Sequence, residues 1–216
     1  MISSPLAPGV EHWIGRFFRA GVLGFLFFAV PFLRADVLAN SDFSEGRAHW
    51  GGDAEEIAAP DPATSTGTDT PSTGVTIKLK KDRWTMIYQS FTVREPVLYY
   101  TIVFKLSPDY KLTNQGSDDS AAADFSNVPG IMQLYDVPVG HWTLLYTGTD
   151  PTDSTSIKMK HLEADATLAK TQTLTGKLIN LNNGADASLI LAIPPGEGSV
   201  TLSTVELSPT DPNAQP

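Results

Sequence analysis

Aromatic side chains on alternating positions in the middle of this 216-residue chain are suited to sugar recognition. A pyranose ring has flat C–H faces that pack on exposed aromatic rings, while neighbouring polar groups hydrogen-bond its hydroxyls. We expect Trp84 and Tyr99 to be exposed on one sheet face, at the centre of a stacking groove. The predicted groove consists of Trp84, Tyr88, Tyr99, Trp142 and Tyr146, with Arg83, Lys105 and Gln133 as polar neighbours.

The same sheet face has a second interpretation, in which region 109–175 folds over it and makes a second core layer. Met86 and Val103 favour this alternative, because an open sugar platform would not normally present such apolar side chains. The sequence leaves both interpretations open.

Motifs for catalysis are sparse. The chain contains no G-x-S-x-G, H-E-x-x-H, P-loop or dinucleotide fingerprint, and no cysteine that could act as a nucleophile. His49, His141 and His161 lack the spacing of metal ligands. A glycoside hydrolase needs two facing carboxylates, and the acidic pairs at 55–56 and 118–119 do not indicate such an arrangement. We therefore expect no enzyme, although the sequence leaves a hydrolase or lyase site open.

Apolar and polar residues alternate throughout the chain after residue 35, and no long apolar repeat of 3.6 residues occurs. Turn-forming Gly, Pro, Asn and Asp separate the alternating segments. Strands are predicted at Val37–Ala39, Val75–Lys80, Thr85–Val93, Tyr99–Leu106, Ile131–Tyr135, Trp142–Thr147, Ser156–Leu162, Gly176–Leu181, Ser188–Ile193 and Val200–Leu207. This series predicts an all-β antiparallel sandwich. Glu163–Lys170 alone suits a short helix.

Residues 1–35 have the composition of a secretory signal peptide. Two arginines precede the apolar run Ala20–Leu33, whose length suits a signal core and is short for a membrane-spanning helix. We expect cleavage after Ala35, since cleavage at a second candidate site, after Ala39, would remove the first strand. The expected location is therefore the periplasm, the cell surface or the extracellular space. An uncleaved N-terminal anchor is the alternative, and it is the one expected route to a membrane.

The remaining residues suit a single domain at 36–208. Segments 59–74 and 114–127 are rich in small and polar residues and are predicted to be flexible loops, and 209–216 is predicted to be a disordered tail. Without cysteine an exported domain cannot use disulfides, so its stability depends on a packed core, an ion or a partner. This is ordinary for a bacterial exported sandwich.

The chain is strongly acidic. Its net charge is −9, and removal of residues 1–35 takes away three arginines and one glutamate, which leaves −11. An acidic chain without a basic stripe argues against binding to nucleic acid and to anionic membrane surfaces. Nothing in the sequence indicates the oligomeric state.

Three segments share a pattern with one known group of domains. The sequence NSDFSEG at 40–46 is followed by Trp50, a strand pair follows at 88–93 and 99–104, and GSVTLSTVEL closes the chain at 198–207. In this order the segments resemble galactose-binding-like β-sandwich domains, which include carbohydrate-binding modules of the cellulose- and xylan-binding kind. The resemblance implies a jelly-roll sandwich whose first strand pairs with its last. It also places Trp50, Tyr100 and Phe104 in the core.

Many domains of this group hold a structural calcium through a glutamate in the opening motif and an aspartate in the closing strand. Ser44 and Ser203 occupy those positions here, whereas calcium prefers several oxygen ligands with carboxylates among them. We therefore expect no cofactor, with Ca²⁺ at Asp42 and Glu45 as the alternative. Without an ion, these two residues would cap backbone amides of the turn.

The resemblance implies an exported, non-catalytic domain that binds a polysaccharide or another glycan through exposed aromatic residues. The alternative is a structural, adhesive or protein-interaction module of the cell envelope that has no sugar ligand. Exposure of the predicted aromatic residues would distinguish the two.

Overall fold

Strands make up the regular structure of the chain after residue 35. The computed structural model describes residues 36–56, 74–125, 128, 133–147, 157–168 and 170–214. The predicted signal peptide lies outside the described residues, and so does the predicted loop 59–74 except for Gly74. The described residues contain no helix, and hence none long and apolar enough to cross a membrane.

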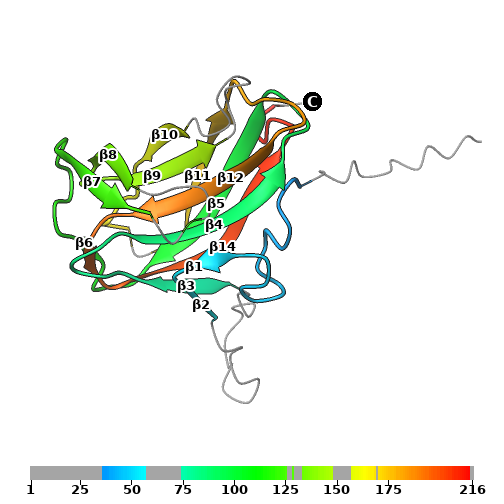
Figure 1. Cartoon of the computed structure of the whole chain (residues 1–216). Coiled ribbons are helices and arrows are strands. Elements are labelled where there is room, and N and C mark those ends of the chain that lie inside the picture. The colour runs from blue at the N-terminus through cyan, green and yellow to red at the C-terminus, as the bar shows by residue number, and fades with distance from the viewer. Residues whose placement is uncertain are drawn as a thin grey trace, which may run out of the picture. The chain divides into compact units, whose positions relative to one another are not determined.

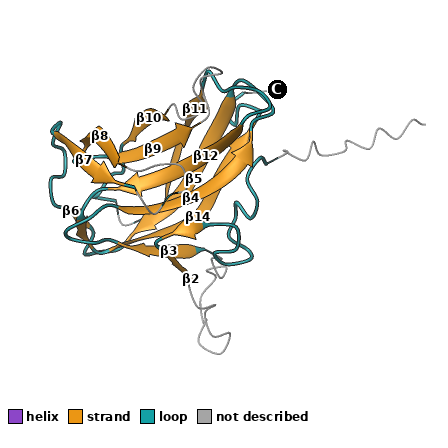
Figure 2. Cartoon of the chain, in the orientation of Figure 1, coloured by secondary structure: helices purple, strands orange, loops and turns teal. Residues whose placement is uncertain are grey.

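Two five-stranded antiparallel sheets pack face to face (Figure 1). Sheet A contains, in spatial order, β1 (Gly51–Gly52), β4 (Thr85–Thr92), β12 (Asp186–Ile193), β9 (Trp142–Thr147) and β10 (Ile157–Leu162). Sheet B contains β11 (Gln172–Leu178), β5 (Leu98–Leu106), β14 (Ser199–Ser208), β3 (Val75–Lys78) and β2 (Ala54–Glu56). The chain crosses from one sheet to the other at most steps, which is the connection pattern of a jelly roll. The predicted all-β antiparallel sandwich is confirmed (Figure 2).

Two short antiparallel pairs supplement the sheets. β13 (Gly196–Glu197) pairs with β6 (Lys111–Leu112), and β7 (Ser120–Asp124) pairs with β8 (Gln133–Pro138).

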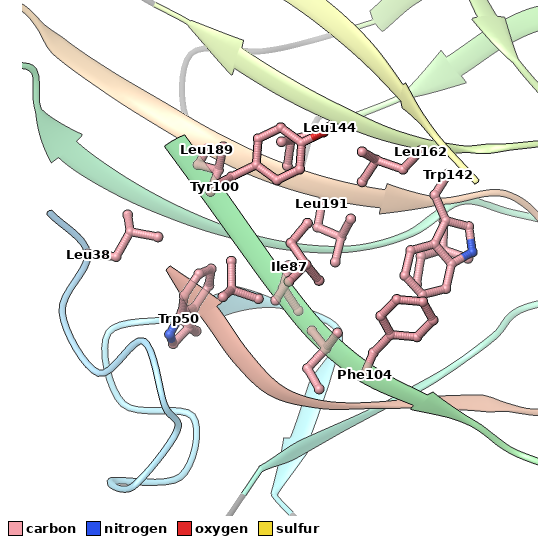
Figure 3. Close-up of a cluster of buried hydrophobic side chains, with 14 of the residues drawn as sticks. Leu38, Trp50, Ile87, Tyr100, Phe104, Trp142, Leu144, Leu162, Leu189 and Leu191 are labelled. Atoms are coloured by element: carbon pink, nitrogen blue, oxygen red, sulfur yellow. The ribbon is translucent and has the colours of Figure 1, made fainter. Parts of the chain in front are cut away.

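The core lies between the sheets, because alternation along each strand turns every second side chain inward. Along β5, every second residue from Leu98 to Leu106 is buried. Side chains from both sheets meet in this core, with Trp50 at one end and Trp142 at the other (Figure 3). Trp50, Tyr100 and Phe104 are buried, as predicted. Burial of a large apolar side chain stabilises the fold by about 1.5–3 kcal/mol, so this core is the main source of stability in a chain without disulfides.

The first residues of the opening stretch, Val37–Ser41, lie beside β14 but do not form a strand. The Val37 N–H donates to the Leu207 carbonyl (2.8 Å), so the opening and closing segments of the domain meet, as predicted. The predicted strand at Val37–Ala39 is wrong, because the segment consists of bends and turns. The next residue, Asn40, has a φ of 49°, so the chain turns directly after this segment.

The Asn40 side chain organises the corner that follows. Its Nδ2 donates to the carbonyls of Gly46 and Ala48 (both 2.9 Å), and its Oδ1 accepts the Glu45 N–H (2.9 Å). The Trp50 indole N–H donates to the Asn40 carbonyl (3.0 Å). Asn tolerates positive φ better than most residues, and this corner fixes Trp50 at the end of the core.

The β7–β8 hairpin covers part of the outer face of sheet A (Figure 1). The prediction of a flexible loop at 114–127 is therefore wrong for β7, where Ala123 is buried. Phe125, just after β7, is fully buried, and its ring centroid lies 6.0 Å from that of Trp84. The cluster under the hairpin consists of Trp84, Met86, Ala123, Phe125, Val128, Val137, Val139, Leu145, Ile190 and Ala192. On sheet A, the structure therefore confirms the alternative interpretation, in which part of region 109–175 folds over the sheet and makes a second core layer.

The helix predicted at Glu163–Lys170 is absent from the described part of that segment. Asp165 Oδ1 instead accepts both the N–H (2.9 Å) and the hydroxyl (2.6 Å) of Thr167, which closes a turn. Short polar side chains of this kind compete with helical hydrogen bonds. In the predicted tail, Asp211 Oδ1 accepts the Asn213 N–H (2.8 Å) in a similar turn, and residues 215–216 lie outside the described ranges.

Candidate functional site

The predicted stacking groove is not assembled. Trp84 precedes β4 and Tyr88 lies on it, in sheet A, whereas Tyr99 lies on β5 of sheet B. The outer faces of the two sheets look in opposite directions, so these rings cannot share one surface. Trp84 is only 6% exposed, because Phe125 and the hairpin cover it. The expectation that Trp84 and Tyr99 lie exposed together is therefore wrong.

Trp142 and Tyr146 share one face of β9, as predicted, but that face is turned into the core. Burial raises the pKa of Tyr146, and a hydrogen bond with the backbone of Ile179 partly offsets this shift. Neither ring is exposed as a stacking platform. Trp142 nevertheless lines a pocket, described below.

The predicted polar neighbours are also dispersed. Arg83 Nη2 lies 2.8 Å from Asp53 Oδ1, and the same carboxylate accepts the Met86 N–H (3.1 Å), so this ion pair ties the β1–β2 connection to β4. Lys105 is exposed on the outer face of sheet B. Gln133 begins β8, and its side chain lies outside what the structure describes.

A pocket of about 200 Å³ lies at one end of the sandwich, where the segments around β6, β9 and β10 approach each other. Its floor is apolar and aromatic, and its rim is polar. The lining residues are Tyr110, Leu112, Gln115, Gly116, Gly140, His141, Trp142, Leu162, Glu163 and Ala164.

The floor of this pocket is built on Trp142. Its ring centroid lies 4.7 Å from that of Phe104 in the core and 6.4 Å from that of Tyr110, which it meets edge-on. Figure 3 shows Trp142 beside Phe104 and Leu162, with the indole nitrogen directed away from the rest of the cluster. That nitrogen donates to the Tyr110 hydroxyl oxygen over 2.7 Å.

The Tyr110 hydroxyl remains a donor across the physiological pH range. Burial raises the pKa of Tyr110 to about 12, although the hydrogen bond from Trp142 acts in the opposite direction. The phenol therefore stays protonated. Because its oxygen already accepts from the indole, its own hydrogen is available to another acceptor.

Two glycines shape the wall of the pocket. The Gly116 N–H donates to the Gly140 carbonyl (3.2 Å), which joins the two loops backbone to backbone. A Cβ on Gly140 would lie 2.3 Å from the Ser117 carbonyl oxygen, so only glycine fits there. Gly116 has a φ of +74°, which glycine adopts without strain. The wall is thus held by backbone contacts.

The rim carries the groups that would recognise a ligand. Gln115 and Glu163 are exposed, and His141 is partly buried with its Nε2 3.9 Å from Asp118 Oδ1. An amide, an imidazole and a carboxylate can each bond to hydroxyls. Glu163 is the one carboxylate among the described lining residues, whereas glycoside hydrolysis uses two.

Tyr88 lies in a second, more open groove of about 300 Å³, lined by Ala39, His49, Tyr88, Gln89 and Ser90. Tyr88 is half-buried, and its ring lies so close to Gly51 that a Cβ there would meet it at 2.4 Å. Beside it, the hydroxyls of Ser90 and Ser188 are 3.0 Å apart. Among the predicted groove residues of sheet A, Tyr88 is thus the aromatic ring that remains partly open.

The opening corner uses its acidic residues within the turn. Asp42 Oδ1 accepts the Ser44 N–H (3.1 Å), and the hydrogen bonds with Ser44 lower the pKa of Asp42. Glu45 Oε2 lies 3.8 Å from His49 Nε2. Within the described ranges, no cluster of three or more His, Asp or Glu residues could hold a metal ion. The Asp42 contacts are those expected of a turn-capping residue.

Comparison with known proteins yields structural similarity only. No protein-family model and no curated protein matches the chain. Among solved structures, the chain is similar to the carbohydrate-binding module TmCBM61 in complex with β-1,4-galactotriose (10% identity, 80% of this chain and 97% of that chain covered, TM-score 0.46). It is also similar to the CBM22-1 xylan-binding domain of Paenibacillus barcinonensis Xyn10C (12%, 81% and 94%, 0.45). A third similar structure is the enzymatically active domain of bacteriophage CBA120 tailspike protein 4 (8%, 80% and 21%, 0.46).

Proposed function

We propose that this chain is an exported, non-catalytic β-sandwich that binds a glycan in the pocket above Tyr110 and Trp142. The observation that carries the proposal is the composition of this pocket. It joins an aromatic and aliphatic floor, which suits the C–H face of a sugar, to polar groups that suit its hydroxyls. The Tyr110 hydroxyl adds a donor held in place by Trp142.

The size of the pocket limits the ligand. Its volume of about 200 Å³ is below the roughly 300–1,000 Å³ of sites for drug-sized molecules. We therefore expect it to hold one sugar residue, such as the end of a polysaccharide, rather than a run of several. The backbone bond that joins the loops at Gly116 and Gly140 holds this wall of the pocket in place.

The charge of the rim selects among sugars. Glu163 lines the pocket and Asp118 lies beside His141, and the chain as a whole is acidic. A carboxylate-bearing sugar would be repelled by these groups. The expected ligand is a neutral or amino sugar, and uronic acids should bind more weakly.

Calorimetric titration of the 36–216 fragment with neutral oligosaccharides, chitosan oligomers and oligouronates tests the proposal. Gln115→Ala should weaken binding about 2- to 10-fold, the equivalent of one lost hydrogen bond. Glu163→Gln removes the charge and one acceptor oxygen and should weaken binding by a similar factor, because hydrogen bonds to charged groups are the stronger ones. Glu206→Gln, on the outer face of sheet B, is the matched control and should bind like the unchanged protein. Absence of binding across the panel, or equal binding by all three variants, would contradict the proposal.

A structural or protein-interaction role is the second candidate, and two observations favour it. The hairpin covers the part of sheet A where stacking aromatic residues were expected. On that hairpin, Tyr135 is 68% exposed and is thus available to a protein partner. If the glycan panel is negative, sedimentation of the fragment and of Tyr135→Ser would show whether this surface mediates self-association.

A further inference from the structure

Asp36, the first described residue, is already fixed to the sandwich. Its Oδ1 accepts the N–H groups of Leu38 (3.0 Å) and Leu207 (3.2 Å), and the adjacent Val37 N–H donates to the Leu207 carbonyl. These bonds attach the start of the domain to β14.

The other carboxylate oxygen of Asp36 lacks a hydrogen-bond donor in the part of the chain that the structure describes. Oδ2 is buried and has no hydrogen-bond partner among the described residues. A buried carboxylate oxygen without a partner is costly. Asp36 also lines a cavity of about 310 Å³, together with Arg94, Glu95 and Pro209.

The next three residues are integral to the fold. Leu38 is buried in the core. Ala39 exchanges two bonds with the buried Gln89 side chain: its N–H donates to Oε1 (2.7 Å), and its carbonyl accepts from Nε2 (2.9 Å). Loss of Asp36–Ala39 would leave the Gln89 amide buried without these partners. This argues against processing after Ala39.

We propose that a leader peptidase cuts this chain between Ala35 and Asp36, and that the new α-ammonium group becomes the partner of Asp36 Oδ2. Water adds across the Ala35–Asp36 amide. The acyl carbon of Ala35 takes the hydroxyl and leaves as a carboxylate, and the Asp36 nitrogen takes protons to become an ammonium. Processing would thus supply a donor to an oxygen that has no partner among the described residues.

The chemistry of the two groups makes the pairing feasible. An α-amino group has a pKa of roughly 7.7–8.0 and is therefore charged at neutral pH. It offers three donors, whereas the amide of the uncut chain offers one. The nitrogen and the side-chain carboxylate belong to the same residue, so the pairing needs no other residue to approach. The proposal does not depend on glycan binding.

Intact-mass analysis and N-terminal sequencing of the exported protein test the cleavage position. The full 216-residue chain is expressed in an export-competent bacterial host, and the mature product should begin Asp-Val-Leu-Ala. Ala35→Leu should block processing and accumulate the precursor, whereas the matched variant Ala39→Leu should be cut normally. A product that begins at Asn40, or an uncut chain, would overturn the proposal.

Thermal unfolding tests the ammonium–carboxylate pair. The mature 36–216 protein should melt about 2–4 °C above a 35–216 form that carries one extra alanine. In an Asp36→Asn background this difference should vanish, because the carboxylate is gone. Arg94→Gln should preserve the difference. The pairing is refuted if the two forms melt together, if the difference survives Asp36→Asn, or if Arg94→Gln abolishes it.

Discussion

Replacement of Tyr110 by Phe probes the contact that joins the core to the candidate pocket. The substitution keeps the ring and removes one oxygen, the acceptor of the buried Trp142 indole N–H at 2.7 Å. Trp142 is 1% exposed, so the substitution leaves a buried indole N–H without its protein acceptor. The variant should therefore be less stable than the unchanged protein, and it should also lose the hydroxyl donor of the pocket.

The size of the stability loss follows from the unpaired donor. A buried polar group without its partner costs about 1–3 kcal/mol. For a domain of 150–250 residues this corresponds to roughly 2–4 °C in Tm per kcal/mol. Tyr110→Phe should thus lower Tm by about 2–12 °C, with an unchanged denaturant m value because the surface exposed on unfolding stays the same.

The dependence of stability on alkaline pH tests the Tyr110 hydroxyl independently. The pKa of Tyr110 is raised from 10.0 to about 12 in the folded protein, so the folded state retains its proton where the unfolded state releases it. The associated stability, about 2–3 kcal/mol, is present below pH 10 and is lost as the pH rises to 12. Tyr110→Phe lacks this contribution. The difference in free energy of unfolding between the unchanged protein and the variant should therefore become smaller above pH 10. Burial also raises the pKa values of Tyr100 and Tyr146, which leaves part of the alkaline loss in the variant.

Urea unfolding of both proteins from pH 7 to pH 11, followed by circular dichroism, would measure these effects. Tyr135→Phe is the matched control, since Tyr135 is exposed and the change should leave stability within about 0.5 kcal/mol. If Tyr110→Phe unfolds at the same urea concentration as the unchanged protein, the indole–phenol bond does not contribute to stability and the reasoning about the pocket floor is wrong.

Three further outcomes are expected. Gly140→Ala should lower the free energy of unfolding in urea by about 1–3 kcal/mol and weaken ligand binding, because the new Cβ has no room. In the control variant Gly116→Ala, the new Cβ meets no atom within 4 Å, so the loss should be only the strain of its positive φ, about 1 kcal/mol. Phe125→Ala should lower the free energy of unfolding by about 3–5 kcal/mol. It should also shift tryptophan fluorescence to longer wavelength, because Trp84 becomes exposed. Unshifted fluorescence would mean that the hairpin still covers Trp84. Calorimetry with and without a chelator should give one Tm, since an ion bound only to the native state would raise it.

The strand pattern was predictable because each sheet buries one face. Alternation located Trp142–Thr147 with correct bounds, and it placed Thr85–Val93 within one residue of the observed β4. The predicted pairing of the opening stretch with β14 also holds as backbone contact. The error at Val37–Ala39 has a local cause: the Asn40 corner needs a positive φ directly after these residues, and that requirement does not appear in hydrophobic alternation.

Positions of the aromatic residues were less predictable, because alternation assigns a residue to a face without saying what covers the face. Trp84 was correctly assigned away from the main core, but the Phe125 side chain, from a segment of mostly small and polar residues, closes over it. Tyr99 follows Trp84 closely in sequence, yet the chain changes sheets between β4 and β5. Within the pocket, the His141–Trp142 dipeptide was visible in the sequence, whereas Tyr110 and Gln115 are brought to it by loops that carry no periodic signal.

Burial of Trp142 changes what kind of recognition this domain can offer. An exposed ring would bind sugars by its free face and tolerate many orientations, but Trp142 packs against Phe104 within the core and is fixed by Tyr110. The pocket floor is therefore part of the packed core, and one wall is held by the backbone bond between Gly116 and Gly140. A pre-organised pocket loses little conformational entropy when a ligand binds. Its selectivity must then come from its shape and from the polar groups of its rim. For this reason the binding test uses variants at Gln115 and Glu163, and the floor is changed only by Tyr110→Phe, which keeps the ring. Removal of a floor ring would unfold the site together with the core.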